Sequence, residues 1–211
     1  MPRKRKNRIV YLDTNVILDF IDKDSEAVVL MKSLKTRGWQ LRVSTLGMIE
    51  LIDYKKNDLY LWKKLSKGSS LNTILKRIRD PRNDRKLRQY DFQQVSEWLE
   101  QVIAELPNIG FLELNEDDAW QLALKISVYS NLQTKDVIHF ATAVAAAQND
   151  GCDFFITSDG QLLKEAVRLK LGITGIRSLK LMKPREFVDK YPPLKKQSKS
   201  KRPKSKQTKK T

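Results

Sequence analysis

The chain has 211 residues, 40% of them hydrophobic, a formal net charge of +16 and a single cysteine. This length suits one α/β domain with appendages, and it leaves little room for two full domains. One cysteine excludes an intramolecular disulfide, and the apolar run at 9–12 is too short for a signal peptide or a membrane span. With no Cys/His cluster to indicate zinc, we expect a soluble cytoplasmic protein.

The positive charge is concentrated in three segments. Residues 3–8 contain five Lys or Arg and residues 192–211 contain nine, which leaves 27 basic and 25 acidic residues elsewhere. Within that remainder, residues 63–88 carry ten basic and two acidic residues, so a basic arm flanks an acidic body. Such segments attract polyanions because neutralised phosphates release counterions, and we expect a nucleic acid partner. The alternative is a solubilising tail and a solvated charged face without a specific partner.

The first part of the chain alternates short β-branched runs with helical patterns. In order, we predict a strand at 9–12, helices at 15–21 and 25–37, a strand at 41–43 and a helix capped by Ser44 or Thr45. Gly38 stops the second of these helices. Residues 55–106 continue with charge-rich helical patterns, which we interpret as an inserted helical arm. Trp62, Trp98 and Trp120 recur at helical spacing, and we expect them in the core rather than as base-stacking platforms.

The second half repeats the alternation. We predict a strand at 111–114, a helix capped by Asn115, a helix capped by Thr134 that runs to 149, a strand at 153–157, a helix at 161–171 capped by Gly172, an edge strand at 174–177 and a short helix at 184–190. The Lys-rich remainder has too few apolar residues to fold. We therefore expect an α/β fold with a mostly parallel sheet, divided into a basic extension (1–8), a domain (9–190) and a disordered basic tail (191–211).

Four acidic residues follow apolar runs or begin predicted helices. They are Asp13 in IVYLDTN, Glu50 in VSTLGMIEL, Asp136 in QTKDVIHFATA and Asp159 in FFITSDGQL. Residues just past the carboxyl ends of parallel strands meet in one crevice, so these distant carboxylates can come together. Clustered carboxylates repel one another unless a cation offsets them, and Mg²⁺ or Mn²⁺ prefers oxygen ligands. Such an ion activates water for phosphodiester hydrolysis. The sequence does not decide whether one ion or two ions bind.

In this order, the four motifs resemble those of the PIN domain family of metal-dependent nucleases, over residues 9–54 and 111–177. The resemblance implies a three-layer α/β/α fold and a Mg²⁺- or Mn²⁺-dependent endoribonuclease that leaves 5′-phosphate and 3′-hydroxyl ends. It implies that Asp13, Glu50, Asp136 and Asp159 are the catalytic metal ligands. The polar neighbours Thr14, Asn15, Thr157 and Ser158 resemble residues that position these acids and the phosphate. Some relatives are toxins of toxin–antitoxin pairs, which makes an antitoxin protein a candidate partner.

The insertion at 55–106 is longer than the corresponding segment of small PIN toxins, which puts the toxin role in doubt. Its basic side chains either grip RNA or contact a second copy or an antitoxin. The alternative function is a catalytically silent RNA-binding or assembly module. A phosphatase of the haloacid dehalogenase type is excluded because Asn15 replaces the second Asp of that motif. His139 is either a packed, hydrogen-bonded residue, which we favour, or a group that approaches the scissile phosphate or a metal-bound water.

Overall fold

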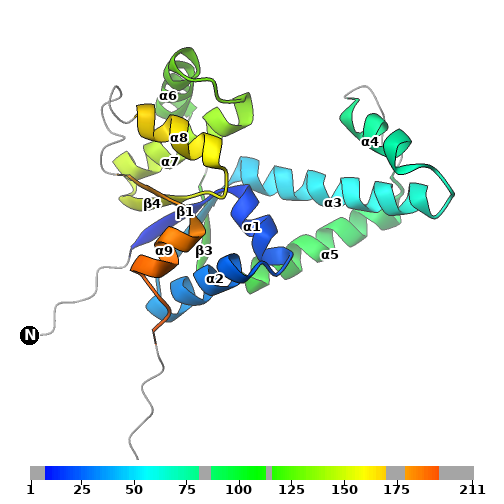
Figure 1. Cartoon of the computed structure of the whole chain (residues 1–211), viewed down its shortest axis with the longest axis horizontal. Helices are drawn as coiled ribbons and strands as arrows, with labels where there is room; N and C mark the ends of the chain where they lie inside the picture. Colours follow the sequence, from blue (N-terminus) through cyan, green and yellow to red (C-terminus); the bar gives the residue numbers. More distant parts are fainter. Residues whose placement is uncertain (1–7, 81–86, 113–115, 170–178, 195–211) are drawn as a thin grey trace, which may run out of the picture.

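A five-stranded parallel β-sheet forms the centre of the molecule (Figure 1). The computed structural model describes residues 8–80, 87–112, 116–169 and 179–194. Within them the strands are β1 (Ile9–Leu12), β2 (Gln40–Ser44), β3 (Ile109–Leu112), β4 (Cys152–Ile156) and β5 (Lys180–Met182). Their order is β3-β2-β1-β4-β5, and every neighbouring pair is parallel. The predicted parallel sheet is confirmed.

Helices connect these strands. They are α1 (Thr14–Ile21), α2 (Ser25–Arg37), α3 (Thr45–Leu65), α4 (Leu71–Arg79), α5 (Gln89–Glu105), α6 (Glu116–Tyr129), α7 (Thr134–Asn149), α8 (Gly160–Leu169) and α9 (Pro184–Lys190). Gly38 ends α2 at a φ of 65°, in the left-handed region that glycine adopts without strain, as predicted. None of the helices in the described ranges is long and apolar enough to cross a membrane.

The sheet is buried on both faces. Along β1, Val10 and Leu12 belong to one apolar cluster and Tyr11 to the other, because successive strand residues point to opposite faces. Side chains from α1, α2, α3, α5 and α9 complete the first cluster, and those from α6, α7 and α8 complete the second. The result is the three-layer α/β/α architecture, with the strand ends left free to present polar side chains at one edge.

Helices α3, α4 and α5, here called the arm, project from the body (Figure 1). Helix α3 runs unbroken from Thr45 to Leu65, so residue 55, the predicted start of the insertion, lies inside a helix. Lys63 of α3 contacts the carboxylate of Asp91 of α5, and the ion pair joins the two helices. The division of the chain into domains stays a prediction.

Several predicted element ends lie elsewhere. Strand β3 begins at Ile109 instead of 111, because its register is set by pairing with β2, where Ile109 lies opposite Leu41. Residues 113 and 114 of the predicted strand lie outside the described residues. The N-cap of α7 is Gln133, with extended backbone, and Thr134 is already helical. Strand β5 was not predicted. The strand expected at 174–177 and the caps expected at Asn115 and Gly172 lie outside the described residues.

The expectation that the three tryptophans are core residues was wrong for two of them. Trp62 has 65% and Trp120 has 47% of its surface exposed. Trp98 is half-buried, and its ring lies 6.4 Å from that of Tyr54. Helical spacing shows that residues share a face, but only tertiary packing decides whether that face is covered.

The first described residues of the predicted tail are part of the folded body. The ring of Tyr191 lies 5.2 Å from that of Trp39 and 5.4 Å from that of Phe154. The guanidinium group of Arg8 lies 5.3 Å from the Trp39 ring and 5.6 Å from the Tyr191 ring. The two ends of the described chain therefore pack against the same aromatic cluster, and residues 195–211 lie outside the description.

Candidate functional site

The acids reach one edge of the sheet because parallel strands end there together. Asp13 follows β1 and is the N-cap of α1, and its amide donates to the carbonyl of Ile156 at 3.0 Å. Asp159 follows the neighbouring strand β4. Glu50 lies in the second turn of α3, directly after β2 on the other side of β1. The three central strands therefore each deliver one carboxylate to their carboxyl end.

Asp13 is held from two sides and is only 4% exposed. Its Oδ1 accepts the amide of Thr14 at 2.8 Å, and its Oδ2 accepts the hydroxyl of Thr157 at 2.7 Å. Burial raises the pKa of Asp13, and the bond from Thr157 and the nearby His139 oppose that rise only in part. The carboxylate is thus fixed in position while its charge remains incompletely compensated.

Asp159 has a structural contact of its own. Its Oδ1 accepts the amides of Gln161 at 2.7 Å and Leu162 at 3.0 Å, so the side chain caps the start of α8. Its own amide donates to the hydroxyl of Thr157 at 3.0 Å. Thr157 therefore links the carboxylate of Asp13 to the backbone of Asp159, and it is fully buried.

Asp136 brings the fourth carboxylate from the first turn of α7. Burial raises the pKa of Asp136, and repulsion from Asp159, Asp13 and Glu50 raises it further. The carboxyl group of Asp136 therefore lies within electrostatic reach of the other three acids, although the four lie far apart in sequence. Their assignment as metal ligands stays a prediction.

Glu50 contacts three groups that favour the ionised form of its carboxyl group. Its Oε2 lies 2.8 Å from Nε2 of His139 and accepts the hydroxyl of Thr14 at 2.8 Å. Its Oε1 lies 3.2 Å from Nζ of Lys135. Burial raises the pKa of Glu50, but the contacts with His139, Thr14 and Lys135 outweigh burial and lower the pKa to about 2. Glu50 is thus a firmly ionised carboxylate that faces α7.

His139 is a packed, hydrogen-bonded residue, as we favoured. It is 2% exposed, and its Nδ1 lies 3.0 Å from the hydroxyl of Tyr11 and 3.3 Å from that of Ser44. Burial raises the pKa of the Tyr11 hydroxyl, which keeps it neutral as a hydrogen-bonding group. The ring thus connects the core side of β1 to Glu50 and does not face solvent.

Sequence reasoning did not identify Lys135, Tyr11 or Ser44 as part of this region. Lys135 and His139 are four residues apart on α7, so they share the face that meets Glu50. That spacing was visible in the sequence, but which helix the face would meet was not. Tyr11 and Ser44 carry hydroxyl groups within buried strands. Buried polar groups need hydrogen-bonding partners, so these two residues could have been identified from the sequence as candidates for the region.

Two of the four predicted supporting residues contact the acids directly. Thr14 contacts Glu50 and Thr157 contacts Asp13 through their hydroxyl groups. Ser158 is exposed and donates to Asp19 at 2.6 Å, and Asn15 is exposed. The roles of all four in positioning the phosphate stay predictions.

The donor set suits a hard divalent cation in its chemistry. Its oxygens are carboxylates, which Mg²⁺ and Mn²⁺ prefer. The pKa of Asp136 is raised by burial and then by repulsion from Asp159 and Asp13, and a bound cation would offset that repulsion. The arrangement is not closed, because within the described ranges no three His, Cys, Asp or Glu side chains are grouped to hold one ion. Glu50 instead faces His139 and Lys135.

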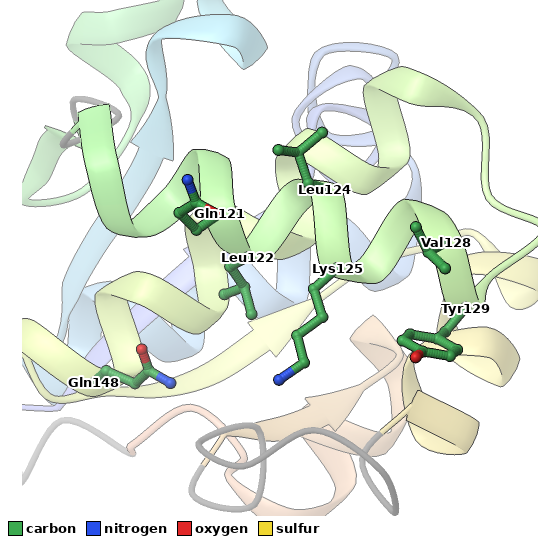
Figure 2. Close-up of a pocket in the computed structure, with 7 residues that line it drawn as sticks. All are labelled: Gln121, Leu122, Leu124, Lys125, Val128, Tyr129 and Gln148. Atoms are coloured by element: carbon green, nitrogen blue, oxygen red, sulfur yellow. The ribbon is translucent and has the colours of Figure 1, made fainter.

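A surface cavity in the described part of the chain lies away from the four acids. It has a volume of about 700 Å³ and is formed by α6 and the end of α7, as Figure 2 shows, and its lining residues are Gln121, Leu122, Leu124, Lys125, Val128, Tyr129 and Gln148. None of the four acids lines it. This cavity is therefore separate from the candidate site at the carboxylate edge.

No protein-family model matches the chain, and a comparison with curated proteins found no match. Among solved structures, the chain is similar to a crystal structure of VapBC2 from Rickettsia felis bound to a DNA fragment from its promoter. The TM-score is 0.46 at 12% identity, over 83% of this chain and 98% of that chain.

Proposed function

We propose that this protein is a PIN-like endoribonuclease that hydrolyses RNA phosphodiester bonds and uses Mg²⁺ or Mn²⁺. The observation that supports the proposal is the raised pKa of Asp136 at the carboxyl edge of the sheet, which is caused by burial and, beyond that, by repulsion from Asp159, Asp13 and Glu50. Such repulsion destabilises a fold, and perturbed acids concentrated at one edge are typical of functional sites. The resemblance of the surrounding motifs to PIN nucleases supports the reaction class.

Asp13, Asp136 and Asp159 are the residues we assign to hold the ion, with Glu50 as the fourth acid. The bound ion would supply a nucleophilic water near neutral pH and neutralise charge on the phosphate. Asp13 is the most firmly positioned, by Thr14 and Thr157. Asp159 uses Oδ1 to cap α8, which leaves Oδ2 as the oxygen that we assign to the ion.

Lys135 and His139 have different roles in this proposal. The side chain of Lys135 is 62% exposed at the same edge, so its ammonium group is available to a phosphate oxygen of the RNA. His139 is buried beneath Glu50 and has no access to an RNA strand. We therefore assign His139 as a positioning residue that orients Glu50.

The test is cleavage of a fluorescently quenched single-stranded RNA in Mn²⁺ by the full chain. We expect turnover that EDTA stops and that Asp13→Asn and Asp136→Asn each reduce at least about a hundredfold. The matched control is Asp189→Asn, which makes the same charge change at an exposed position of α9. Full activity in both site variants would exclude the assignment.

The second candidate is a catalytically silent RNA-binding module. One observation favours it: Glu50 is paired with His139 and Lys135, and no three described metal-ligating side chains are grouped around one point. This candidate predicts salt-sensitive RNA affinity without turnover. Purified protein that binds RNA in Mn²⁺ and leaves it intact, with no Mn²⁺-dependent rise in thermal stability, would support it over the nuclease.

The toxin role is part of the nuclease proposal and is supported only by the family resemblance. Expression of the wild-type chain should then arrest bacterial growth, and Asp13→Asn should relieve the arrest. Normal growth on expression of an enzyme that is active in vitro would favour housekeeping RNA processing instead.

A further inference from the structure

The far end of the arm combines exposed basic and aromatic side chains. Residues 63–79 contain six basic and no acidic residues. Among them Lys67, Lys76 and Arg79 are exposed. The neighbouring Trp62 has 65% of its surface exposed, although indole rings are usually largely covered in folded proteins. This end of the arm is thus positively charged and carries an uncovered aromatic ring.

Helix α4 presents its cations outward. It is capped by Ser70, whose hydroxyl accepts the amide of Thr73, and it buries Ile74, which is 1% exposed. At about 100° per residue, Lys76 and Arg79 share one face of the helix, opposite to Ile74. Packing through Ile74 therefore turns the two cations away from the rest of the arm. Both lie in the last turn, where cations are favoured by the helix dipole.

A second exposed aromatic side chain lies at the same end. Tyr90, near the start of α5, has 67% of its surface exposed. Tyr90 is the sequence neighbour of Asp91, and Trp62 is the sequence neighbour of Lys63. The carboxylate of Asp91 contacts the ammonium group of Lys63. The ion pair therefore brings the segments that carry Trp62 and Tyr90 together, and it accounts for one basic residue of the segment without covering either ring.

We propose that this end of the arm binds single-stranded RNA, with Trp62 and Tyr90 as stacking surfaces for bases and Lys76 and Arg79 as phosphate contacts. RNA fits better than an acidic protein segment because exposed rings beside cations match alternating bases and phosphates. The inference rests on the proposed function and names how the substrate is held. Glu50 and Trp62 lie on the same helix, about 18 Å apart along its axis at 1.5 Å per residue. A strand bound to the arm thus also reaches the carboxylate edge.

The test measures affinity in EDTA, where the nuclease proposal predicts no cleavage. A fluorescein-labelled oligouridine is titrated with the full chain over a range of salt concentrations. For the double variant Lys76→Glu/Arg79→Glu we expect at least about a tenfold loss of affinity and a salt slope shallower by about 1.4, as for two lost phosphate contacts. For Trp62→Ala we expect about a tenfold loss, as for one lost base stack.

Matched controls make the same changes on the body. Lys32→Glu/Lys35→Glu alters the net charge equally at exposed positions of α2, and Trp120→Ala removes an exposed tryptophan from α6. Both should retain near wild-type affinity. Circular dichroism confirms that each variant is folded. If the arm variants bind the oligouridine as tightly as their controls, the inference is overturned.

Three further outcomes distinguish this inference from an acidic protein partner and from the nuclease proposal. Competition with poly-L-glutamate distinguishes an acidic protein partner: if Trp62→Ala weakens poly-L-glutamate and oligouridine binding equally, the ring does not read bases and the RNA assignment fails. If RNA binding depends on the arm while Mn²⁺ supports no cleavage, the nuclease proposal fails and the arm inference stands. If cleavage occurs but RNA affinity is independent of the arm, the nuclease proposal stands and the arm inference fails.

Discussion

The hydroxyl group of Thr157 donates a 2.7 Å hydrogen bond to Oδ2 of Asp13 across the junction between β4 and β1. The same hydroxyl accepts the amide of Asp159 at 3.0 Å. One fully buried side chain therefore sets the position of two of the four acids. Loss of the Thr157 hydroxyl should therefore lower the stability of the protein and disturb the positions of both acids.

Thr157→Val should destabilise the protein by about 1–3 kcal/mol, because it leaves a buried carboxylate oxygen and a backbone amide without their partner. Thr157→Ser keeps the hydroxyl and should lose clearly less. Urea denaturation followed by circular dichroism measures both. Equal stability of the valine variant and the wild type would show that the hydroxyl does not hold Asp13.

Asp136→Asn should stabilise the metal-free protein at neutral pH by less than about 1 kcal/mol, because solvent screens the partly exposed carboxylate. The pKa of Asp136 is raised by burial and by Asp159 and Asp13, so the folded state disfavours its ionised form. The carboxyl therefore stabilises folding fully only below its unfolded pKa, and this contribution is lost as pH rises through the folded pKa. The amide removes the charge.

Thermal melts with and without Mn²⁺ measure this prediction. The wild type should gain stability from Mn²⁺, and the Asp136→Asn variant should gain much less. Asp189→Asn, on exposed α9, serves as the control and should melt like the wild type in both conditions. A variant that is less stable than the wild type without metal would contradict the repulsion on which the proposed site depends.

His139→Leu should raise the pKa of Glu50 from about 2 toward its ordinary value of 4.5, because the largest favourable contact of the carboxylate is removed. Carboxyl-carbon NMR of labelled glutamate follows this titration. Lys135→Met removes a longer contact, at 3.2 Å from an exposed side chain, and should produce a smaller rise. An unchanged Glu50 titration in the leucine variant would disprove the orienting role of His139.

Asp91→Asn should destabilise the arm by about 0.5–1.5 kcal/mol, because the neutral amide removes the ion pair with Lys63. The pKa of Asp91 is lowered by Lys63 and by the amide of Arg88, so its contribution is present above an unfolded pKa of about 3.9 and is lost as pH falls through the folded value. The stability difference between wild type and variant should therefore shrink in acid.

The control for this prediction is the pair of Asp58 with Lys55 on α3, at 2.8 Å and partly exposed. Asp58→Asn should change stability by less than about 1 kcal/mol. Hydrogen exchange of α3 and α5 amides localises the effect to the arm. A pH-independent difference for Asp91→Asn would show that the ion pair with Lys63 is not its source.

The sequence by itself determined most of the local elements of this protein, although not strand β5. A short β-branched run such as 9–12 is typical of a strand that is buried on both faces. Gly38 can end a helix in the left-handed conformation, which strains other residues. The strands and helices predicted in this way, and the parallel sheet, therefore followed from local chemistry. The edge position of Asp13 and Asp159 followed in the same way, because each comes directly after a central strand.

Only the tertiary structure decided which faces meet. The pairing of Glu50 with His139 and Lys135 depends on how α3 packs against α7, and no pattern within either helix specifies the other. The exposure of Trp62 and the packing of Tyr191 against Trp39 also depend on how distant elements pack in the tertiary structure. Periodicity defines a face of an element, whereas contacts between distant elements depend on the shapes and charges of the whole chain at once.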